Sequence, residues 1–238
     1  MNKFSTMAFS AIAFLFGLSS KEASAAPLIP QDCRPEPAIQ DLLNLVNAAG
    51  NPLDLLTREN AAQTWMVREL DSKKIIRAIP VASVRDSIVP ARNHQIPIRI
   101  YNPKPKAKKL PILVYIHGGG WTLGSLAAYD NIARGLATKV GAIVVTVDYR
   151  LAPEHPFPAG IDDARLAFEW VLRNATELGG DAKNIGLAGD SGGATLATVI
   201  ARKTAEAGFP VKLQALFYPA TNLSAMDTAS YVANGEGY

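Results

Sequence analysis

The feature that most constrains the fold is a regular alternation of short apolar runs with longer amphipathic segments in the second half of the chain. The apolar runs have the length of buried strands, and the segments between them carry apolar residues at helical spacing. Because parallel strands need long crossovers, this order predicts an α/β fold, a mostly parallel sheet with helices on both faces. The expected strands are residues 112–116, 142–147, 185–188 and 213–217, and the expected helices are residues 127–140, 161–173 and 192–207.

The sheet is expected to begin with a different pattern. Between residues 79 and 101, Ile96, Ile98 and Ile100 alternate with other residues, which predicts a β-hairpin of two strands. We therefore assign residues 76–238 to the α/β domain.

The segments before residue 76 have two patterns. Lys3 precedes an apolar run at residues 7–18, and the Ala-Ser-Ala sequence at 23–25 offers a small-residue cleavage site, which is typical of a secretory signal peptide over residues 1–25. The run is shorter than the ~20 residues that span a bilayer, so we expect export to the periplasm or the medium and no stable membrane insertion. Residues 26–75 then show helical spacing in two stretches and are expected to form helices ahead of the sheet.

A sharp strand-to-helix turn is the strongest local signal for chemistry. The sequence Gly189-Asp190-Ser191-Gly192-Gly193 follows an apolar strand and opens a helix rich in alanine, as a nucleophile elbow does. Glycines two positions on either side of the serine relieve the crowding of so tight a turn. We expect the turn to hold Ser191 in a strained conformation, to expose its Oγ and to aim the N–H of Gly192 at developing negative charge.

A second glycine-rich segment follows the first expected strand of the parallel set. It reads His117-Gly118-Gly119-Gly120-Trp121, and its bare amides suit the stabilisation of a tetrahedral oxyanion. A flexible loop or a phosphate cradle is the alternative. A phosphate loop would close its glycine run with Lys and Ser or Thr, whereas Trp121 stands there.

The segment at residues 148–159 follows the strand that ends at Val147 and reads DYRLAPEHPFPA. Its charges and prolines favour a rigid, internally paired connection. Asp148 and Glu154 in isolation suggest an acid/base pair, and His155 a general base. Nothing in the sequence fixes His155 near Ser191, so we interpret the segment as a rigid connection and not as a source of catalytic groups.

Composition excludes two further classes. The formal net charge is +3, and Lys and Arg are scattered apart from a cluster at residues 104–109, so no nucleic-acid partner is expected. Cys33 is the only cysteine, which rules out an internal disulfide.

Taken together, the HGGGW, DYRLAPEHPFPA and GDSGG segments, in that order, resemble those of the hormone-sensitive-lipase-like family of α/β hydrolases, also called bacterial family IV esterases. The similarity runs from about residue 38 to the C-terminus. The resemblance implies an α/β-hydrolase fold and hydrolysis of small-molecule esters with short- to medium-chain acyl groups, without a metal or an organic cofactor.

The resemblance also implies roles for individual residues. Ser191 Oγ would attack the ester carbonyl, while His117 would brace the glycine loop and Trp121 would line the acyl pocket. Asp190, next to the nucleophile, is expected to support the site, and the helices at residues 26–75 would form part of a lid. The oxyanion would be held by the amide of Gly192 and by amides among Gly118, Gly119 and Gly120, with the choice between the three left open.

The acid and base that complete such a site are not found. In this family they follow the serine in D-P-L-x-D-like and H-x-F-like segments, whereas the three histidines here all precede Ser191. A serine without a general base is a poor nucleophile, so we expect the chain as given to be inactive and to lack the last strands and helices of the fold. Residues 213–217 would then form an open sheet edge that invites self-association.

Two interpretations remain open. The chain is either the amino-terminal part of a carboxylic ester hydrolase, which we prefer, or a non-catalytic remnant that binds an acyl ligand or a partner chain. Within the enzyme class, an amidase, a carbamate hydrolase and a lipase use the same serine chemistry and are not separated by these residues.

Overall fold

The computed structural model describes residue 44 and residues 77–224. The expected signal peptide at residues 1–25 lies outside this part of the chain, as do the expected N-terminal helices apart from residue 44. Among the described residues, no helix is both long and apolar enough to cross a membrane.

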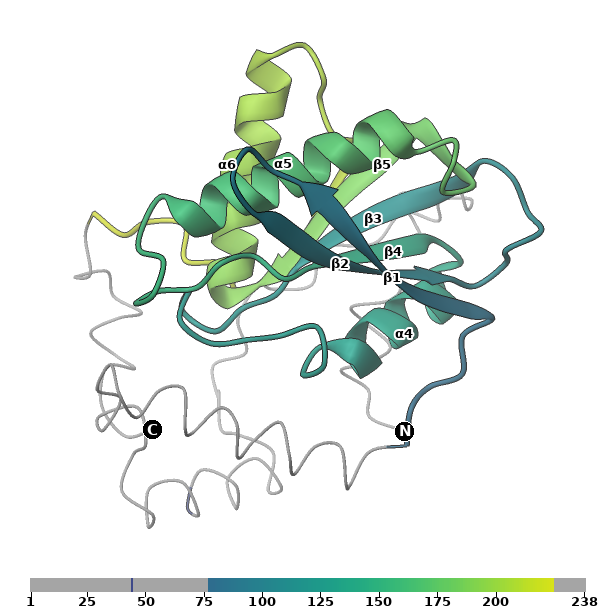
Figure 1. Ribbon diagram of the computed structural model, residues 1–238, viewed down its shortest axis with the longest axis horizontal. Coiled ribbons are helices and arrows are strands. Elements are labelled where there is room, and N and C mark those ends of the chain that lie inside the picture. Colours follow the sequence, from purple (N-terminus) through teal and green to yellow (C-terminus); the bar gives the residue numbers. More distant parts are fainter. Residues whose placement is uncertain (1–43, 45–76, 225–238) are drawn as a thin grey trace, which may run out of the picture.

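A six-stranded sheet forms the centre of the molecule, with the strand order β1-β2-β4-β3-β5-β6 (Figure 1). β3 and β4 pair in parallel, as do β3 with β5 and β5 with β6, whereas β1 and β2 form an antiparallel hairpin that joins the sheet antiparallel to β4. The predicted mostly parallel sheet and the predicted hairpin are thus confirmed. The strands are β1 (Ser83–Pro90), β2 (Gln95–Asn102), β3 (Leu110–Ile116), β4 (Ile143–Val147), β5 (Gly180–Asp190) and β6 (Leu213–Phe217).

Helices cover both faces of the sheet, as predicted. The helices are α4 (Asp130–Val140), α5 (Ala159–Asn174) and α6 (Ser191–Glu206). α5 and α6 bury Phe168, Val171 and Ile200 against one face, and α4 buries Leu136 against the other (Figure 1). Alternate residues of β3 serve the two cores, because successive side chains of a strand point to opposite faces.

Two boundaries differ from the sequence expectation. β5 begins at Gly180, whereas the apolar pattern predicts a strand only at residues 185–188. Its first residue, Gly180, pairs with Leu110, and after a register shift the pairing resumes between Ile112 and Ile185. α4 begins at Asp130, three residues later than expected, because the Ser125 Oγ accepts the N–H of Ala128 (3.1 Å) in a turn that precedes the helix.

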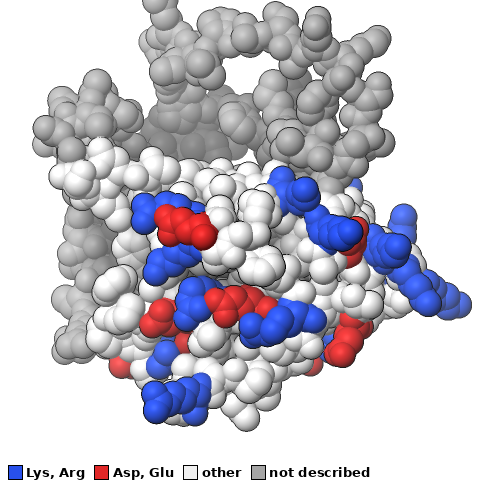
Figure 2. Space-filling model, turned by 90° about the horizontal axis from the view of Figure 1, so that it is seen from above, with Lys and Arg blue, Asp and Glu red and all other residues white. Residues whose placement is uncertain are grey.

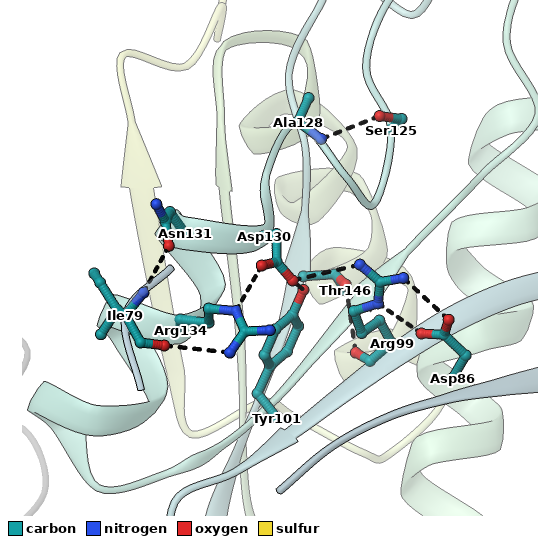
Figure 3. Close-up of polar contacts among 10 residues, drawn as sticks. All are labelled: Ile79, Asp86, Arg99, Tyr101, Ser125, Ala128, Asp130, Asn131, Arg134 and Thr146. Carbon is teal, nitrogen blue, oxygen red and sulfur yellow. Dashed lines mark hydrogen bonds and ion pairs between the residues drawn. The ribbon is translucent and has the colours of Figure 1, made fainter. Parts of the chain in front are cut away.

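A polar network anchors the first turn of α4 to the sheet (Figure 3). The Asp130 carboxylate accepts hydrogen bonds from the hydroxyl of Tyr101 (2.8 Å) and from Arg134, and it pairs with Arg99 at 3.4 Å. Arg99 in turn forms a two-point ion pair with Asp86 of β1. These contacts fix the start of α4, which directly follows the loop after β3.

Charged side chains of both signs are interspersed on the outer face of α5 and α6 (Figure 2). Several belong to pairs one helical turn apart, as between Arg165 and Glu169 and between Arg202 and Glu206. Such exposed pairs contribute little stability each, about 0.3–0.5 kcal/mol.

The segment after β4 is fastened to α5 by a buried carboxylate. Asp163, 1% exposed, accepts the Nε (2.8 Å), the Nη2 (2.9 Å) and the backbone N–H (3.1 Å) of Arg150. It also bonds to the Nε2 of His94 in the β1–β2 turn (2.7 Å). The sequence predicts that Arg150 pairs within its own segment, but it pairs with α5 instead. The reason is that Asp163, buried in the first part of α5, accepts hydrogen bonds from Arg150 at both carboxylate oxygens.

We expect Asp163→Asn to lower the free energy of unfolding by about 1.5–3 kcal/mol at pH 7, the usual size for hydrogen bonds between charged groups. Burial alone would raise the pKa of Asp163, but the hydrogen bonds from Arg150 and His94 outweigh it and hold the pKa below its usual value. The carboxylate therefore contributes its stability above pH ~4 and loses it as the pH falls through the lower folded pKa.

Urea unfolding of the natural chain and the variant at pH 7 and at pH 3 measures this effect. The difference in unfolding free energy between the two proteins should shrink at the lower pH. An equal difference at both pH values would mean that the charge of Asp163 is not what stabilises the fold.

Candidate active site

Ser191 lies at the junction of β5 and α6, in the turn that the sequence predicts. Its φ is 49°, in the left-handed region that side chains other than glycine rarely adopt. A Cβ placed on Gly189 would lie 2.6 Å from the carbonyl oxygen of Ile116, and one on Gly193 would lie 2.2 Å from the same atom. Both glycines are therefore required, because the end of β3 passes directly against the turn.

The glycine loop after β3 turns away from the sheet at Gly119 and Gly120, whose φ values are 112° and 58°. The buried N–H of Gly118 donates to the Asp190 carboxylate (3.0 Å), so it is not available to an oxyanion. The amides of Gly119 and Gly120 have no acceptor among residues 77–224. Of the three glycines that the sequence left open, the last two therefore keep a free donor.

The loop and the turn lie against each other through Trp121 and Gly192. The indole Nε1 of Trp121 donates to the carbonyl oxygen of Gly192 (3.0 Å). A Cβ built on Gly192 would lie 3.5 Å from the backbone nitrogen of Gly120. Because Gly192 is in the first turn of α6, its own N–H has no partner within the helix. Free amides from two distant segments thus converge beside Ser191.

The carboxylate of Asp190 is buried beneath this junction and accepts four hydrogen bonds. Its Oδ1 accepts the Tyr115 hydroxyl (2.8 Å) and the Gly118 N–H (3.0 Å). Its Oδ2 accepts the hydroxyls of Tyr129 (3.0 Å) and Tyr218 (3.3 Å). Burial first, and then the negative charge of Asp190, raise the pKa values of Tyr115 and Tyr129 above the usual value, so both phenols stay protonated and can donate.

His117 is buried at the base of the glycine loop. Its Nδ1 lies 2.8 Å from the carbonyl oxygen of Gly118, and its ring stacks on Tyr149 with 4.4 Å between centroids. The Tyr149 hydroxyl donates to the backbone oxygen of His117 (2.8 Å). Burial lowers the pKa of His117, so the ring is neutral and carries its proton on Nδ1 toward the carbonyl. These contacts suit a residue that braces the loop.

An apolar cavity of about 410 Å³ opens beside the glycine loop. Gly120 and Trp121 form one wall, and α6 contributes Leu196 and Val199. The family resemblance implied a pocket position for Trp121, whereas the sequence analysis assigned residues 192–207 only to a helix and named neither Leu196 nor Val199. It also missed the three tyrosines around Asp190, since they come from separate segments.

The remaining histidines lie elsewhere. His94 pairs with Asp163, and His155 lies exposed at the rim of the cavity. No histidine or carboxylate of the described part of the chain forms a hydrogen bond with Ser191 Oγ. Within the same residues, no group of three or more His, Cys, Asp and Glu side chains comes together as a metal site would.

Comparisons with known proteins agree with this geometry. The pattern of the α/β hydrolase fold family matches residues 113–238. The carboxylesterase NlhH of Mycobacterium tuberculosis is 48% identical over 142 residues, which cover 59% of this chain and 44% of that protein. An ethyl acetate hydrolase of Pseudomonas putida is 38% identical over 157 residues, covering 64% of this chain and 49% of that protein. The matched region thus spans less than half of the length of these relatives.

Two solved structures are similar in three dimensions. An ester-hydrolase from the metagenome of Lake Arreo superposes with a TM-score of 0.76 at 38% identity, covering 85% of this chain and 65% of that one. A hyperthermophilic esterase from Pyrobaculum calidifontis superposes with a TM-score of 0.71 at 39% identity, covering 80% and 60%. The strained serine turn, the glycine loop facing it and these similarities lead to one assignment: the chain belongs to the α/β-hydrolase fold family, among the hormone-sensitive-lipase-like or bacterial family IV esterases.

Proposed function

We propose that this chain carries the nucleophile and the oxyanion site of a serine hydrolase that cleaves carboxylic esters with short- to medium-chain acyl groups. The observation that carries the proposal is the convergence at Ser191: a left-handed serine on a sharp turn, with the amide nitrogen of Gly120 close to Gly192. The names of the relatives, a carboxylesterase and an ethyl acetate hydrolase, support the same substrate class.

The proposed reaction begins with attack of Ser191 Oγ on the ester carbonyl carbon. A C–O bond forms, the hydroxyl proton passes to a base, and the carbonyl oxygen becomes an oxyanion. The N–H groups of Gly119, Gly120 and Gly192 donate to this oxyanion, each such donor being worth roughly 2.7–4 kcal/mol in other enzymes. The tetrahedral species then expels the alcohol, which takes up a proton, and water later releases the acid from Ser191.

Among residues 77–224, no histidine or carboxylate is hydrogen-bonded to Ser191 Oγ to serve as this base. His117 is buried and neutral with its Nδ1 on the Gly118 carbonyl, and His94 is bound to Asp163. His155 lines the cavity but forms no hydrogen bond with Ser191. We therefore propose that turnover by these residues alone is slow. In subtilisin, loss of the catalytic histidine costs about 2 × 10⁶ in kcat and leaves roughly 10³–10⁴ over water from the remaining site.

The cavity beside the glycine loop is the proposed acyl pocket. Its walls are mostly apolar, so transfer of an alkyl chain from water is favourable by about 0.8 kcal/mol for each buried methylene. Gly120, whose N–H is proposed to bind the oxyanion, also lines this cavity, which supports a path from the reacting carbonyl into the pocket.

A non-catalytic role is the second candidate. β6 lies at one edge of the sheet in the described part of the chain and pairs there with β5 alone. An edge of this kind offers free N–H and C=O groups to another strand, so self-association or partner binding is the proposed activity if Ser191 is unreactive. Sedimentation of the purified chain tests the self-association.

Export is proposed on the amino-terminal pattern at residues 1–25, which has a charged start, an apolar run and a small-residue site. Amino-terminal sequencing of the protein recovered from cell fractions tests it. A new terminus near residue 26 in the periplasm or the medium is expected, and an intact terminus in the cytoplasm would contradict export.

We expect Ser191 to be acylated when an external base is supplied. The chain is incubated with p-nitrophenyl butyrate with and without imidazole, and the protein is analysed by mass spectrometry of its peptides. Imidazole accepts the Oγ proton, so a butyryl group should appear on the Ser191 peptide and should be absent from Ser191→Ala.

Equal labelling of other serines, or a Ser191 peptide that stays unmodified, would contradict the proposed function. Ser87→Ala on β1 is the matched control, because it removes a hydroxyl far from the glycine loop and should leave the labelling unchanged.

Narrowing the cavity should discriminate against longer acyl chains. Val199→Phe fills space that a medium-length chain would occupy, with a clash of about 1–3 kcal/mol, so octanoyl transfer should fall roughly tenfold or more relative to acetyl transfer. Ile132→Phe, at an exposed apolar position of α4, is the control. An unchanged octanoyl-to-acetyl ratio in Val199→Phe would place the acyl chain elsewhere.

A further inference from the structure

The carboxylate of Asp190 is unusually placed for a charged group. It is 6% exposed, lies one residue before Ser191, and none of the Lys and Arg side chains described in the structure forms an ion pair with it. The carboxylate is stabilised instead by hydrogen bonds from three phenol hydroxyls and one peptide N–H. Buried charge is costly unless it is fully hydrogen-bonded, so this arrangement calls for a physical reason.

The four donors come from four separate segments that meet at the site. Tyr115 is near the end of β3, and Gly118 is in the glycine loop that follows. Tyr129 immediately precedes α4. Tyr218 immediately follows β6. One carboxylate thus holds together the segments that surround the serine turn.

The contact with Gly118 is the one that bears on the oxyanion. A Cβ on Gly118 would lie 2.4 Å from Oδ2 of Asp190, so this glycine packs directly on the carboxylate. Its N–H points inward, and the positive φ values of Gly119 and Gly120 then turn the chain outward. Exposure follows the same order, since Gly118 is buried, Gly119 is half-buried and Gly120 is exposed.

We propose that Asp190 is a positioning residue: it holds the Gly118 peptide inward and thereby presents the N–H groups of Gly119 and Gly120 to the oxyanion beside Ser191. This inference rests on the proposed function. The three tyrosines keep the carboxylate in one rotamer, so they act on the glycine loop through Asp190.

An anionic acceptor suits this task better than an amide. A carboxylate accepts at both oxygens, whereas the Asn side chain offers one oxygen and an NH₂ group that only donates. The substitution Asp190→Asn could keep one contact to Gly118 but would present donors to the hydroxyls of Tyr129 and Tyr218, which would have to rotate. Replacement by Ala removes every acceptor and leaves the Gly118 N–H buried without a partner.

The test uses a p-nitrophenyl alkylphosphonate, whose phosphonyl oxygen resembles the oxyanion. With imidazole as the base, the Ser191 Oγ–P bond forms, the P–O bond to p-nitrophenolate breaks, and the proton passes to imidazole. The rate of labelling is measured for the natural chain, Asp190→Asn, Asp190→Ala and Tyr115→Phe. Tyr101→Phe is the matched control, because it removes a buried hydroxyl that donates to a carboxylate, Asp130, away from the glycine loop.

Labelling should slow about tenfold in Asp190→Asn and on the order of 10²-fold in Asp190→Ala, the lower range for loss of an oxyanion donor. Tyr115→Phe should slow it a few-fold, and Tyr101→Phe should not change it. The phosphorus chemical shift of the adduct should move in the Asp190 variants, since it reports hydrogen bonds to the phosphonyl oxygen. A folded Asp190→Ala with the natural rate and shift, or an equal loss in Tyr101→Phe, would overturn the proposal.

Hydrogen exchange of the Gly118 amide gives a readout that needs no chemistry at Ser191. Exchange should accelerate in Asp190→Asn and in Tyr115→Phe and stay slow in Tyr101→Phe. If Ser191 is never labelled but exchange follows this order, the proposed function fails while the positioning of the loop stands. If exchange at Gly118 is unchanged, Asp190 does not hold the loop, and this result decides the matter even where Asp190→Ala does not fold.

Discussion

The structure depends on how closely the serine turn approaches the end of β3. The carbonyl oxygen of Ile116 lies within 2.6 Å of the place where a side chain on Gly189 or Gly193 would begin. This contact fixes the height of Ser191 relative to the sheet, and it brings the residues that follow Ile116 to the same place. The reactive hydroxyl and the glycine loop are neighbours because two strands end side by side, as β3 and β5 pair in parallel up to Gly189.

Hydrogen bonds then fix the conformation of the glycine loop, which this packing does not determine. A glycine loop has few steric preferences of its own, so its conformation has to come from contacts. His117 binds the Gly118 carbonyl, Asp190 binds the Gly118 N–H, and Trp121 binds the carbonyl of Gly192. With both the N–H and the C=O of Gly118 bound from the interior, the amides that follow are left for a ligand.

Much of this architecture follows from the sequence, because it rests on periodicity and on glycine. The predicted strand at residues 213–217 coincides with β6, and the left-handed serine follows from the GDSGG turn. The early start of β5 could not be predicted, since it rests on the pairing of Gly180 with Leu110, and the polar residues 181–184 that follow lie at a register shift. The sequence also could not show that the Gly118 N–H is unavailable to an oxyanion, because this depends on one N–H pointing toward the Asp190 carboxylate, which is distant in sequence.

Trp121 joins two tasks that are usually separate. Its indole nitrogen is bound to the first turn of α6, while its ring forms a wall of the apolar cavity. A change at this position that reshapes the cavity therefore also releases the carbonyl of Gly192 and loosens the helix start beside the nucleophile. Ligand preference and the geometry of the reacting atoms cannot vary independently at Trp121, so new selectivity is more readily reached through α6 positions such as Val199, which line the cavity without a side-chain hydrogen bond to the serine turn.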